Sequence, residues 1–127
     1  MKFIESDNLP LAIGPYSPAV KVHGMIYTSA QVPVTLDGTM IERDIKIQTR
    51  QVLSNLRTLL EDADSGLEKV VKVSVYLENI EEFGVVNVLF AEAFGDHKPA
   101  RTTISVKGLP KNALIMVDAI ALANDYH

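Results

Sequence analysis

Residues 70–77 read Val70-Val71-Lys72-Val73-Ser74-Val75-Tyr76-Leu77 and form the clearest predicted β-strand of the chain. The stretch is rich in β-branched residues, which favour strands, and successive side chains of a strand point to opposite faces. One face is predicted to carry Val71, Val73, Val75 and Leu77, and the other Val70, Lys72, Ser74 and Tyr76. On both sides of this strand, apolar residues recur at the spacing of a helix and not of a strand. This change in spacing decides the fold.

Helical periodicity flanks the strand on both sides. From Asp44 to Ala63, apolar residues recur at intervals of three and four, which predicts a helix with Asp44 as its N-cap and Gly66 just beyond its end. The same spacing predicts a second helix over about Ile80–Phe94. The strand at residues 70–77 is therefore expected between two helices.

Further strands complete the predicted sheet. Ala19–Val22 and Met25–Ala30 are predicted to form a hairpin, because the two-residue connection His23-Gly24 suits a tight turn. Two more strands are expected. One begins near Arg101, and the other runs from about Leu114 to Leu122, with a turn near residues 109–112 between them.

This order of elements predicts one α+β domain over residues 1–127. A strand–helix–strand unit closes most easily as a right-handed crossover between parallel strands, so two helices are expected on one face of a mixed sheet. The last strand is apolar on both faces, however, with Ile115 and Val117 alternating against Leu114 and Met116. A sheet with one face in water normally alternates apolar with polar residues, so we expect other subunits to cover this face and to form ligand clefts.

Composition excludes several classes of site. The chain has 127 residues, 47% of them hydrophobic, and no cysteine, so a disulfide framework, a thiolate metal site and a cysteine nucleophile are impossible. The net charge of −4, without a block of lysines and arginines, gives no electrostatic footprint for nucleic acid. The opening residues are not an apolar signal region, and no apolar run is long enough to span a membrane, so we expect a cytoplasmic protein.

No metal or cofactor is expected either. His23, His97 and His127 are far apart in the sequence and show no ligand spacing. Histidines in turns and loops are usually solvated polar groups, and we expect His127 to fray with the end of the chain.

Arg101 is the leading candidate for binding a small organic acid. It follows a proline-led loop and enters a strand, where its planar guanidinium can hold a carboxylate through two parallel hydrogen bonds. The alternative is an ordinary surface salt bridge, worth roughly 0–1 kcal/mol. Tyr16 is a second candidate, because the glycine and prolines of the loop at residues 12–18 hold it in a non-helical path.

Five short motifs follow one another along the chain: Ala12-Ile13-Gly14-Pro15-Tyr16, Thr28-Ser29-Ala30-Gln31-Val32-Pro33, Val86-Asn87, Pro99-Ala100-Arg101 and Leu109-Pro110-Lys111. Together they resemble the landmarks of the RidA/YjgF family, the reactive intermediate deaminases, over nearly the whole chain. The resemblance implies a chorismate-mutase-like (ferredoxin-like) fold and a homotrimer with clefts between subunits. It also implies hydrolysis of 2-imino or enamine acids, such as 2-iminobutanoate and 2-iminopropanoate, to 2-oxo acids and ammonia.

The same resemblance assigns roles to individual residues. Arg101 matches the catalytic arginine that grips the substrate carboxylate, and Tyr16 matches the tyrosine that lines the cleft. Ser29 and Asn87 match polar substrate-binding positions. A strand-end cap for Ser29 and a helix-surface amide for Asn87 are equal alternatives. Ala30 and Thr103 are expected to line the same cleft.

One position departs from the family pattern. The family has a glutamate seven residues after the Leu-Pro-Lys turn begins, and this chain has Met116 there. A thioether has no proton to exchange in acid/base catalysis, so weaker activity or a different substrate is expected. Asp118, on the same strand face and about 6.6 Å further along, is the alternative acid/base. It matches a second acidic position of the family pattern, so a structural carboxylate is the favoured interpretation.

Three functional classes remain open. The leading one is an imine or enamine deaminase that acts on products of pyridoxal-phosphate dehydratases. The second is a trimer that binds small carboxylates as a sensor or regulator without turning them over, and Met116 is the residue that separates these two classes. The third is an endoribonuclease or translation inhibitor, and the acidic charge balance counts against it.

Overall fold

The computed structural model describes residues 1–125, so the expectation for His127 lies outside the described residues. In chain order the elements are β1 (Lys2–Ile4), β2 (Ala19–Val22), β3 (Met25–Thr28), α1 (Ile45–Asp62), η1 (Leu67–Lys69), β4 (Val70–Leu77), η2 (Ile80–Glu82), α2 (Phe83–Phe94), β5 (Ala100–Ser105), η3 (Pro110–Asn112) and β6 (Ile115–Leu122), where η marks a short 3₁₀ helix.

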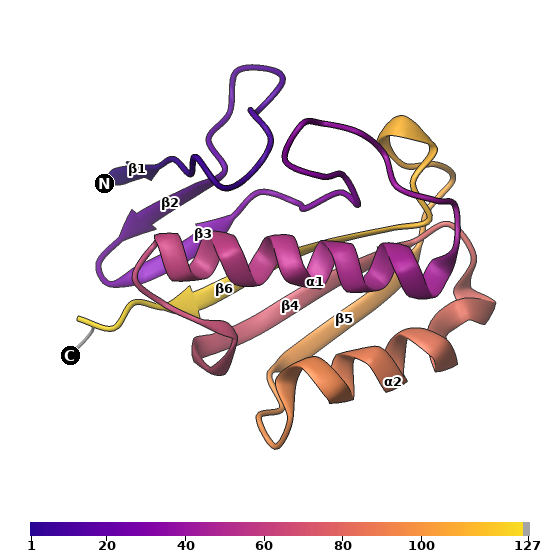
Figure 1. The fold of residues 1–127 in the computed structure, drawn as a ribbon. Coiled ribbons are helices and arrows are strands. Elements are labelled where there is room, and N and C mark those ends of the chain that lie inside the picture. The colour runs from indigo at the N-terminus through magenta and orange to yellow at the C-terminus, as the bar shows by residue number, and fades with distance from the viewer. Residues whose placement is uncertain (126–127) are drawn as a thin grey trace.

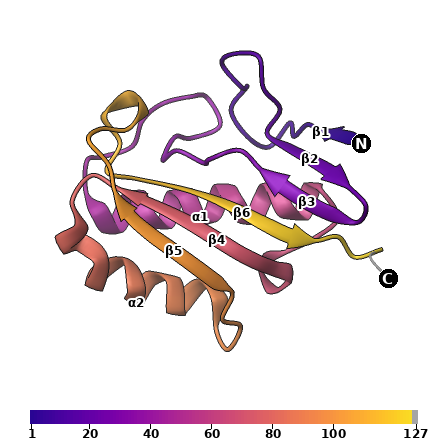
Figure 2. The same cartoon turned by 180° about the vertical axis from the view of Figure 1, so that it is seen from behind.

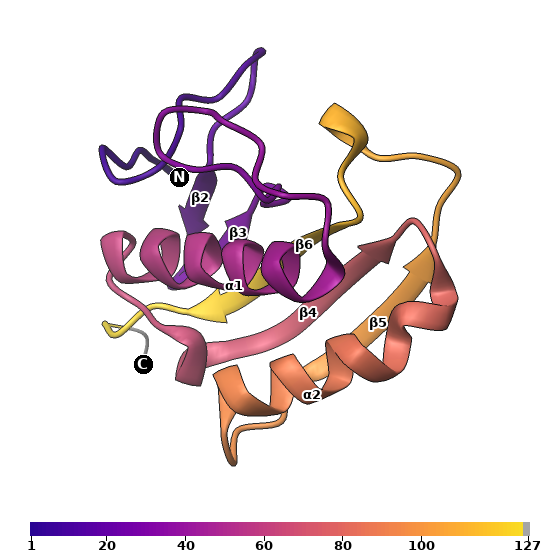
Figure 3. The ribbon, with the colours of Figure 1, turned by 45° about the vertical axis from the view of Figure 1, so that its right-hand side comes forward.

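The strands form a six-stranded sheet in the order β1-β2-β3-β6-β4-β5. β4 and β5 run parallel, as the strand–helix–strand unit predicted, and the other neighbouring pairs are antiparallel. Both α1 and α2 lie on one face of the sheet, as Figure 1 shows from the front and Figure 3 shows after a turn of 45°. The predicted α+β fold, with two helices on one face of a mixed sheet, is therefore confirmed for the described residues.

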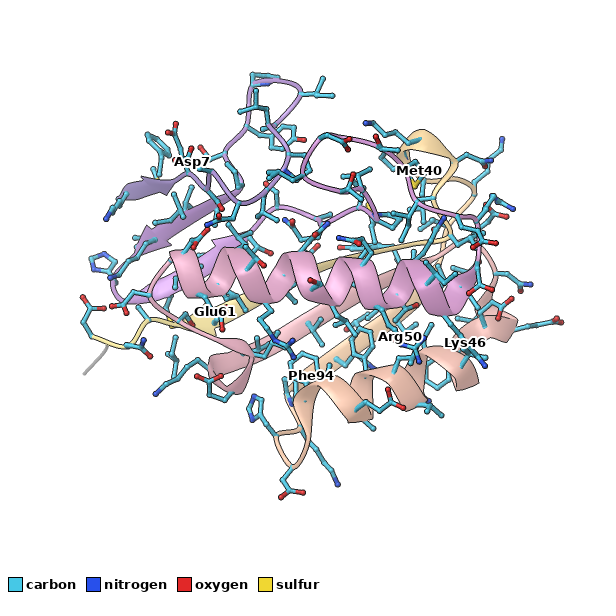
Figure 4. The ribbon with its side chains drawn as sticks, viewed as in Figure 1. Asp7, Met40, Lys46, Arg50, Glu61 and Phe94 are labelled. Carbon is cyan, nitrogen blue, oxygen red and sulfur yellow. The ribbon has the colours of Figure 1, made fainter. Side chains whose placement is uncertain are left out.

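α1 begins where the sequence predicted. The Asp44 carboxylate accepts a hydrogen bond from the Ile47 N–H at 3.0 Å, which satisfies one of the free amides of the first turn. The apolar stripe of α1, with Leu56 fully buried near its middle, packs on the sheet and forms the core. Lys46 and Arg50, labelled in Figure 4, lie on the exposed side of the same helix.

The end of α1 differs from the expectation. Asp64, with φ 61°, adopts the left-handed conformation just after the helix, whereas Gly66, with φ 179°, is extended. The Asn124 side chain donates to Asp64 Oδ1 at 3.0 Å, and the Asn124 N–H donates to the Asp64 carbonyl at 2.8 Å. Aspartate tolerates this conformation better than most residues, so two bonds from the far end of the chain let it end the helix without a glycine.

Several predicted boundaries also shift. β3 ends at Thr28 and not at Ala30, because the chain leaves the sheet before Gln31 pairs with Val117 as a single bridge. The helix expected from Ile80 starts as the 3₁₀ turn η2 and becomes α-helical only at Phe83. β1 was not predicted, since three residues are too few to show a period.

A β-bulge overturns the predicted faces at the start of β4. The register between β4 and β6 shifts between Val70 and Lys72. As a result Val70 is buried and Val71 is 45% exposed, the reverse of the prediction. From Val73 onward the alternation holds as predicted, because the ladder with β6 is unbroken there.

The face of the sheet opposite the helices is turned toward the viewer in Figure 2. Phe3, Val20, Tyr27 and Ile120 pair in register across four neighbouring strands on this face. Phe3 is 64% exposed and Tyr27 is 42% exposed. A contiguous exposed apolar row is typical of an interaction surface, so the covering of this face by other subunits stays a prediction with structural support.

Leu56→Ala tests the position of the core. The substitution is expected to lower the free energy of unfolding by about 2–5 kcal/mol, because Leu56 is fully buried and the shortened side chain leaves a cavity. Urea unfolding at constant protein concentration measures it. Val88→Ala is the control, since Val88 is 59% exposed on α2 and its loss should change stability by less than about 0.5 kcal/mol. Equal effects of the two substitutions would contradict this core.

Candidate functional site

A hollow of about 980 Å³ is lined by segments that are far apart in the sequence. They are the loops at residues 9–18 and 28–38, Asn55 of α1, the turn at Pro110 and two residues of β6. Apolar side chains predominate in the lining: Leu9, Leu11, Ile13, Val32, Val34, Leu36 and Met116. The hollow also brings together residues that the sequence analysis selected, namely Tyr16, Ser29, Ala30, Met116 and Asp118.

Tyr16 is held by a tight turn. Its N–H donates to the Gly14 carbonyl at 3.0 Å, and Gly14 has φ 123°, a conformation that side chains strongly disfavour. A Cβ added to Gly14 would lie 3.4 Å from the Tyr16 ring. The ring is 55% exposed and lines the hollow, so it is positioned by the backbone of its loop and remains accessible to a ligand.

Ser29 has a structural hydrogen bond. Its hydroxyl donates to the Ser17 carbonyl at 2.6 Å, and its N–H donates to the Pro18 carbonyl at 2.8 Å. These bonds join the Tyr16 loop to the end of β3. The Ser29 hydroxyl therefore uses its one proton in a structural bond at the strand end, which was the alternative to a role in substrate binding. The hydroxyl oxygen retains acceptor capacity toward the hollow, and the substrate-binding role of Ser29 stays a prediction.

Met116 and Asp118 project from the uncovered face of β6 into the hollow. On β4, Tyr76 pairs with Met116 and Ser74 with Asp118. The Tyr76 hydroxyl donates to Asp118 Oδ2 at 2.9 Å. This hydrogen bond, together with partial burial and the negative charge of Asp118, raises the pKa of the Tyr76 phenol above its usual value, and Ser74 opposes the shift.

Arg101 does not line the hollow. Its guanidinium carbon lies 5.1 Å from the ring centroid of Phe83 and 5.7 Å from that of Phe90, both on α2. Arg101 pairs in register with Val73, whose side chain belongs to the core under the helices. Arg101 therefore lies on the helix-covered face of the sheet, whereas Asp118 lies on the uncovered face.

Within residues 1–125, Arg101 does not form the surface salt bridge that was considered for it. Among residues 1–125, the ion pairs join Lys21 to Asp125 and Arg43 to Glu78. The guanidinium is instead held by cation–π contacts, which leave its charge unneutralised.

Asn87 lies near Arg101 in the fold. It is four residues after Phe83 and three before Phe90, so it shares their side of α2. Its Oδ1 atom is buried and, within the described part of the chain, has no hydrogen-bond partner. Thr103 pairs with Val75 on the same side of the sheet as Arg101. Within a single chain, the predicted site residues therefore form two separate groups. One group lines the hollow, and the other, called the Arg101 cluster below, consists of Arg101, Asn87 and Thr103.

The described residues include no group of three or more His, Cys, Asp and Glu side chains that could hold a metal ion. His97 has a structural contact, since its Nε2 atom lies 2.7 Å from the Val70 carbonyl. Between residues 1 and 125 there is also no helix of the length and apolarity needed to cross a membrane.

Comparison with known proteins places this arrangement in a family. The sequence profile described as Endoribonuclease L-PSP matches residues 6–123. A RutC family protein of Pyrococcus horikoshii is 44% identical over 119 residues, which cover 93% of this chain and 94% of that protein. The chain belongs to the YjgF/RidA/RutC family. The resemblance inferred from the five motifs is therefore confirmed.

Two solved structures are also similar to this chain. A Yersinia pestis protein of the Rid family superposes with a TM-score of 0.93 at 41% identity, covering 96% of this chain and 98% of that one. E. coli TdcF, solved with bound serine, superposes with a TM-score of 0.91 at 30% identity, covering 98% of this chain and all of that one, 100%. The likeness extends over nearly the whole chain in both comparisons.

Sequence reasoning missed one residue that shapes the hollow of this family member. Asn55 is 6% exposed on α1, and its Nδ2 atom donates to the Val32 and Val34 carbonyls, each at 3.0 Å. Its Oδ1 atom accepts a hydrogen bond from Gln51 at 2.9 Å. The signal was present, because an asparagine next to Leu56 interrupts an apolar helix stripe, and a buried amide needs partners.

Asn55→Ala is expected to destabilise the wall of the hollow. It removes the Asn55 donor from both carbonyls, but the Val32 carbonyl keeps its bond from the Val34 N–H, so only the Val34 carbonyl loses its observed donor. A buried carbonyl without a donor costs about 1–3 kcal/mol. Hydrogen exchange of the Val34 and Gln31 amides should become faster than in the parent protein. Asn124→Ala, which removes an exposed amide bonded to Asp64, is the control and should leave these amides unchanged. Unchanged protection in Asn55→Ala would mean that the loop does not depend on this amide.

Proposed function

We propose that this YjgF/RidA/RutC protein is an imine or enamine deaminase, which hydrolyses reactive 2-imino acids such as 2-iminobutanoate and 2-iminopropanoate to 2-oxo acids and ammonia. Arg101 binds the substrate carboxylate, while Tyr16, Ser29, Ala30 and Met116 line the cleft. Protonated imines add water readily, so orientation of substrate and water supplies much of the catalysis; well-oriented reactions gain about 7–11 kcal/mol. Without the family glutamate at Met116, turnover is expected to be weak.

The state of Arg101 is the observation that carries this proposal. Its guanidinium is packed over Phe83 and Phe90 and, among residues 1–125, has no carboxylate partner. The two aromatic rings restrict the side chain without using its in-plane N–H donors. The N–H donors of Arg101 are therefore available to bind the carboxylate of a ligand. The bound serine of the E. coli TdcF structure, an amino acid with a carboxylate, supports a ligand of this size and charge.

The cleft requires a second copy of the chain. Arg101 lies on the helix-covered face of its own sheet, and Met116 lies on the uncovered face, so no small ligand can contact both in one subunit. A homotrimer joins the Arg101 cluster of one subunit to the hollow of its neighbour. The exposed apolar row of the sheet supplies a surface for that association.

Turnover of imines tests the function directly. 2-Iminobutanoate and 2-iminopropanoate are generated in situ by a pyridoxal-phosphate dehydratase, and formation of the 2-oxo acid is measured above the spontaneous rate. The wild-type protein should accelerate hydrolysis, Arg101→Ala should abolish the acceleration, and Arg101→Lys should weaken it, because an ammonium cannot reproduce the planar fork of donors.

Arg57→Lys is the matched control for these variants. Arg57 is exposed on α1, and the same change in chemistry there should leave turnover unaltered. If Arg101→Lys and Arg57→Lys both behave like the wild type, Arg101 is a structural residue and the proposed carboxylate site is wrong.

The assembly is predicted to be a homotrimer with little free monomer, because an obligate interface normally buries a surface that resembles a domain core. Light scattering coupled to size exclusion measures the mass in solution. Tyr27→Lys, which puts a charge into the apolar row, should shift the mass toward monomer. A monodisperse wild-type monomer at micromolar concentration would contradict the trimer and, with it, the shared cleft.

A non-catalytic role is the second candidate, and Met116 is the observation that favours it. A thioether in the hollow offers no acid or base, so the trimer would bind small carboxylates as a sensor or regulator. Calorimetry with 2-oxobutanoate distinguishes the two: binding that depends on Arg101, without turnover of any imine, supports the sensor. The endoribonuclease class is disfavoured by the net charge of −4. The cytoplasm stays the proposed compartment.

A further inference from the structure

Asp118, which lines the hollow, is hydrogen-bonded to a tyrosine of the neighbouring strand. The register of β4 and β6 places Tyr76 beside Met116 and Ser74 beside Asp118. The Tyr76 hydroxyl crosses diagonally between these pairs and donates to Asp118 Oδ2 at 2.9 Å. Among residues 1–125, no hydrogen bond to the second carboxylate oxygen, Oδ1, accompanies it, and Asp118 lines the hollow.

Asp118 is better placed for chemistry than the other acid of the hollow. Asp37 lies in an exposed turn, where hydrogen bonds from the Thr35 hydroxyl and from Thr39 hold its pKa below the ordinary value. Its carboxylate is therefore engaged in the turn and is a weak base. Asp118 instead lies on a central strand of the sheet, half-buried, with one oxygen bonded and one available.

We propose that Asp118 is the general base of the deaminase reaction and that Tyr76 is the positioning residue that orients its carboxylate. The inference rests on the proposed function, since it assigns the acid/base step of that same site. It also revises the interpretation of the sequence, which favoured a structural role for Asp118 because this residue matches a second acidic position of the family pattern.

The proposed steps balance as follows. Asp118 Oδ1 takes a proton from water as the water oxygen bonds to the iminium carbon, and the C=N electron pair moves to nitrogen. The protonated Asp118 then returns this proton to the nitrogen of the carbinolamine. As the C–N bond breaks, Asp118 accepts the hydroxyl proton and passes it to the released ammonia, which leaves a 2-oxo acid and ammonium.

Tyr76 suits the positioning role because it remains a hydrogen-bond donor. The raised pKa of its phenol keeps the O–H protonated throughout the neutral range. By occupying Oδ2, it restricts rotation of the carboxylate and leaves Oδ1 for water. Met116 fills the family glutamate position with an apolar side chain, and the volume of the hollow leaves room for a substrate displaced toward Asp118 along β6.

Charged and titratable residues from the neighbouring strands and loops also surround Asp118. Lys72 lies on the same face of β4, opposite Ile120, and Tyr27 of β3 pairs with Ile120 from the other side. Lys111 and Asp37 line the hollow from their loops, and the Lys111 ammonium donates to the Gly38 carbonyl at 3.3 Å. Of these titratable residues in the described range, Tyr76 is the one that forms a hydrogen bond with Asp118.

The experiment compares the pH profiles of kcat/KM for the full-length wild type, Asp118→Asn, Tyr76→Phe and Tyr27→Phe with 2-iminobutanoate. Asp118→Asn should lower kcat about 100-fold or more and remove the acidic limb of the profile. Tyr76→Phe should lower kcat roughly tenfold with little change in KM, the effect of one hydrogen bond to a charged group.

Tyr27→Phe is the matched control, since it removes a tyrosine hydroxyl from the same sheet face without a bond to Asp118. Thermal melts and light scattering accompany the kinetics. Tyr76→Phe keeps the ring and its packing, so it remains informative even if Asp118→Asn fails to assemble.

Three outcomes would overturn the proposal. If Asp118→Asn turns over like the wild type while Arg101→Ala is inactive, Asp118 is structural and the deaminase function stands. If the profile of Tyr76→Phe matches that of Tyr27→Phe, Tyr76 does not position the base. If the wild type accelerates hydrolysis of no imine, both the acid/base assignment and the proposed function are wrong.

Discussion

The structure depends on one constraint: two helices can cover only one face of a six-stranded sheet. β6 lies between β3 and β4, and its residues on the helix side, such as Val117, are fully buried. On the other side, Ile120 and Leu122 are half-buried with no helix over them. Burial of apolar surface stabilises by about 25 cal/mol per Å². The apolar side chains of the uncovered face can therefore add to stability only when another molecule covers them.

The same layering separates the chemistry. Side chains of a strand alternate between faces, so β5 presents Arg101 to the helices while β6 presents Met116 and Asp118 to the open face. A subunit therefore holds Arg101 and the hollow on opposite faces of the sheet, where they cannot contact one small molecule together. Under the proposed function, association completes the site, which links catalytic competence to assembly without any separate regulatory element.

The surroundings of Arg101 and Asp118 differ in a way that fits their proposed roles. Aromatic rings hold the guanidinium and leave its charge available, whereas a carboxylate partner would have neutralised it. Asp118 has a neutral donor, Tyr76, which orients the carboxylate and preserves its charge. Both groups are thus restrained by neutral partners, so each can still interact with a ligand or with water.

The sequence by itself determined the elements whose signals are local. The strand at residues 70–77, the Asp44 cap, the His23-Gly24 hairpin and the family motifs all depend on neighbours within a few positions. Arg101 and Tyr16 were selected for the same reason, as motif residues. Only the tertiary structure decided that Val70 is buried, that Asp64 ends α1, that Asn55 supports the hollow and that Tyr76 bonds Asp118. These features depend on cross-strand register and helix packing, where a single bulge inverts the faces and brings together residues separated by many positions.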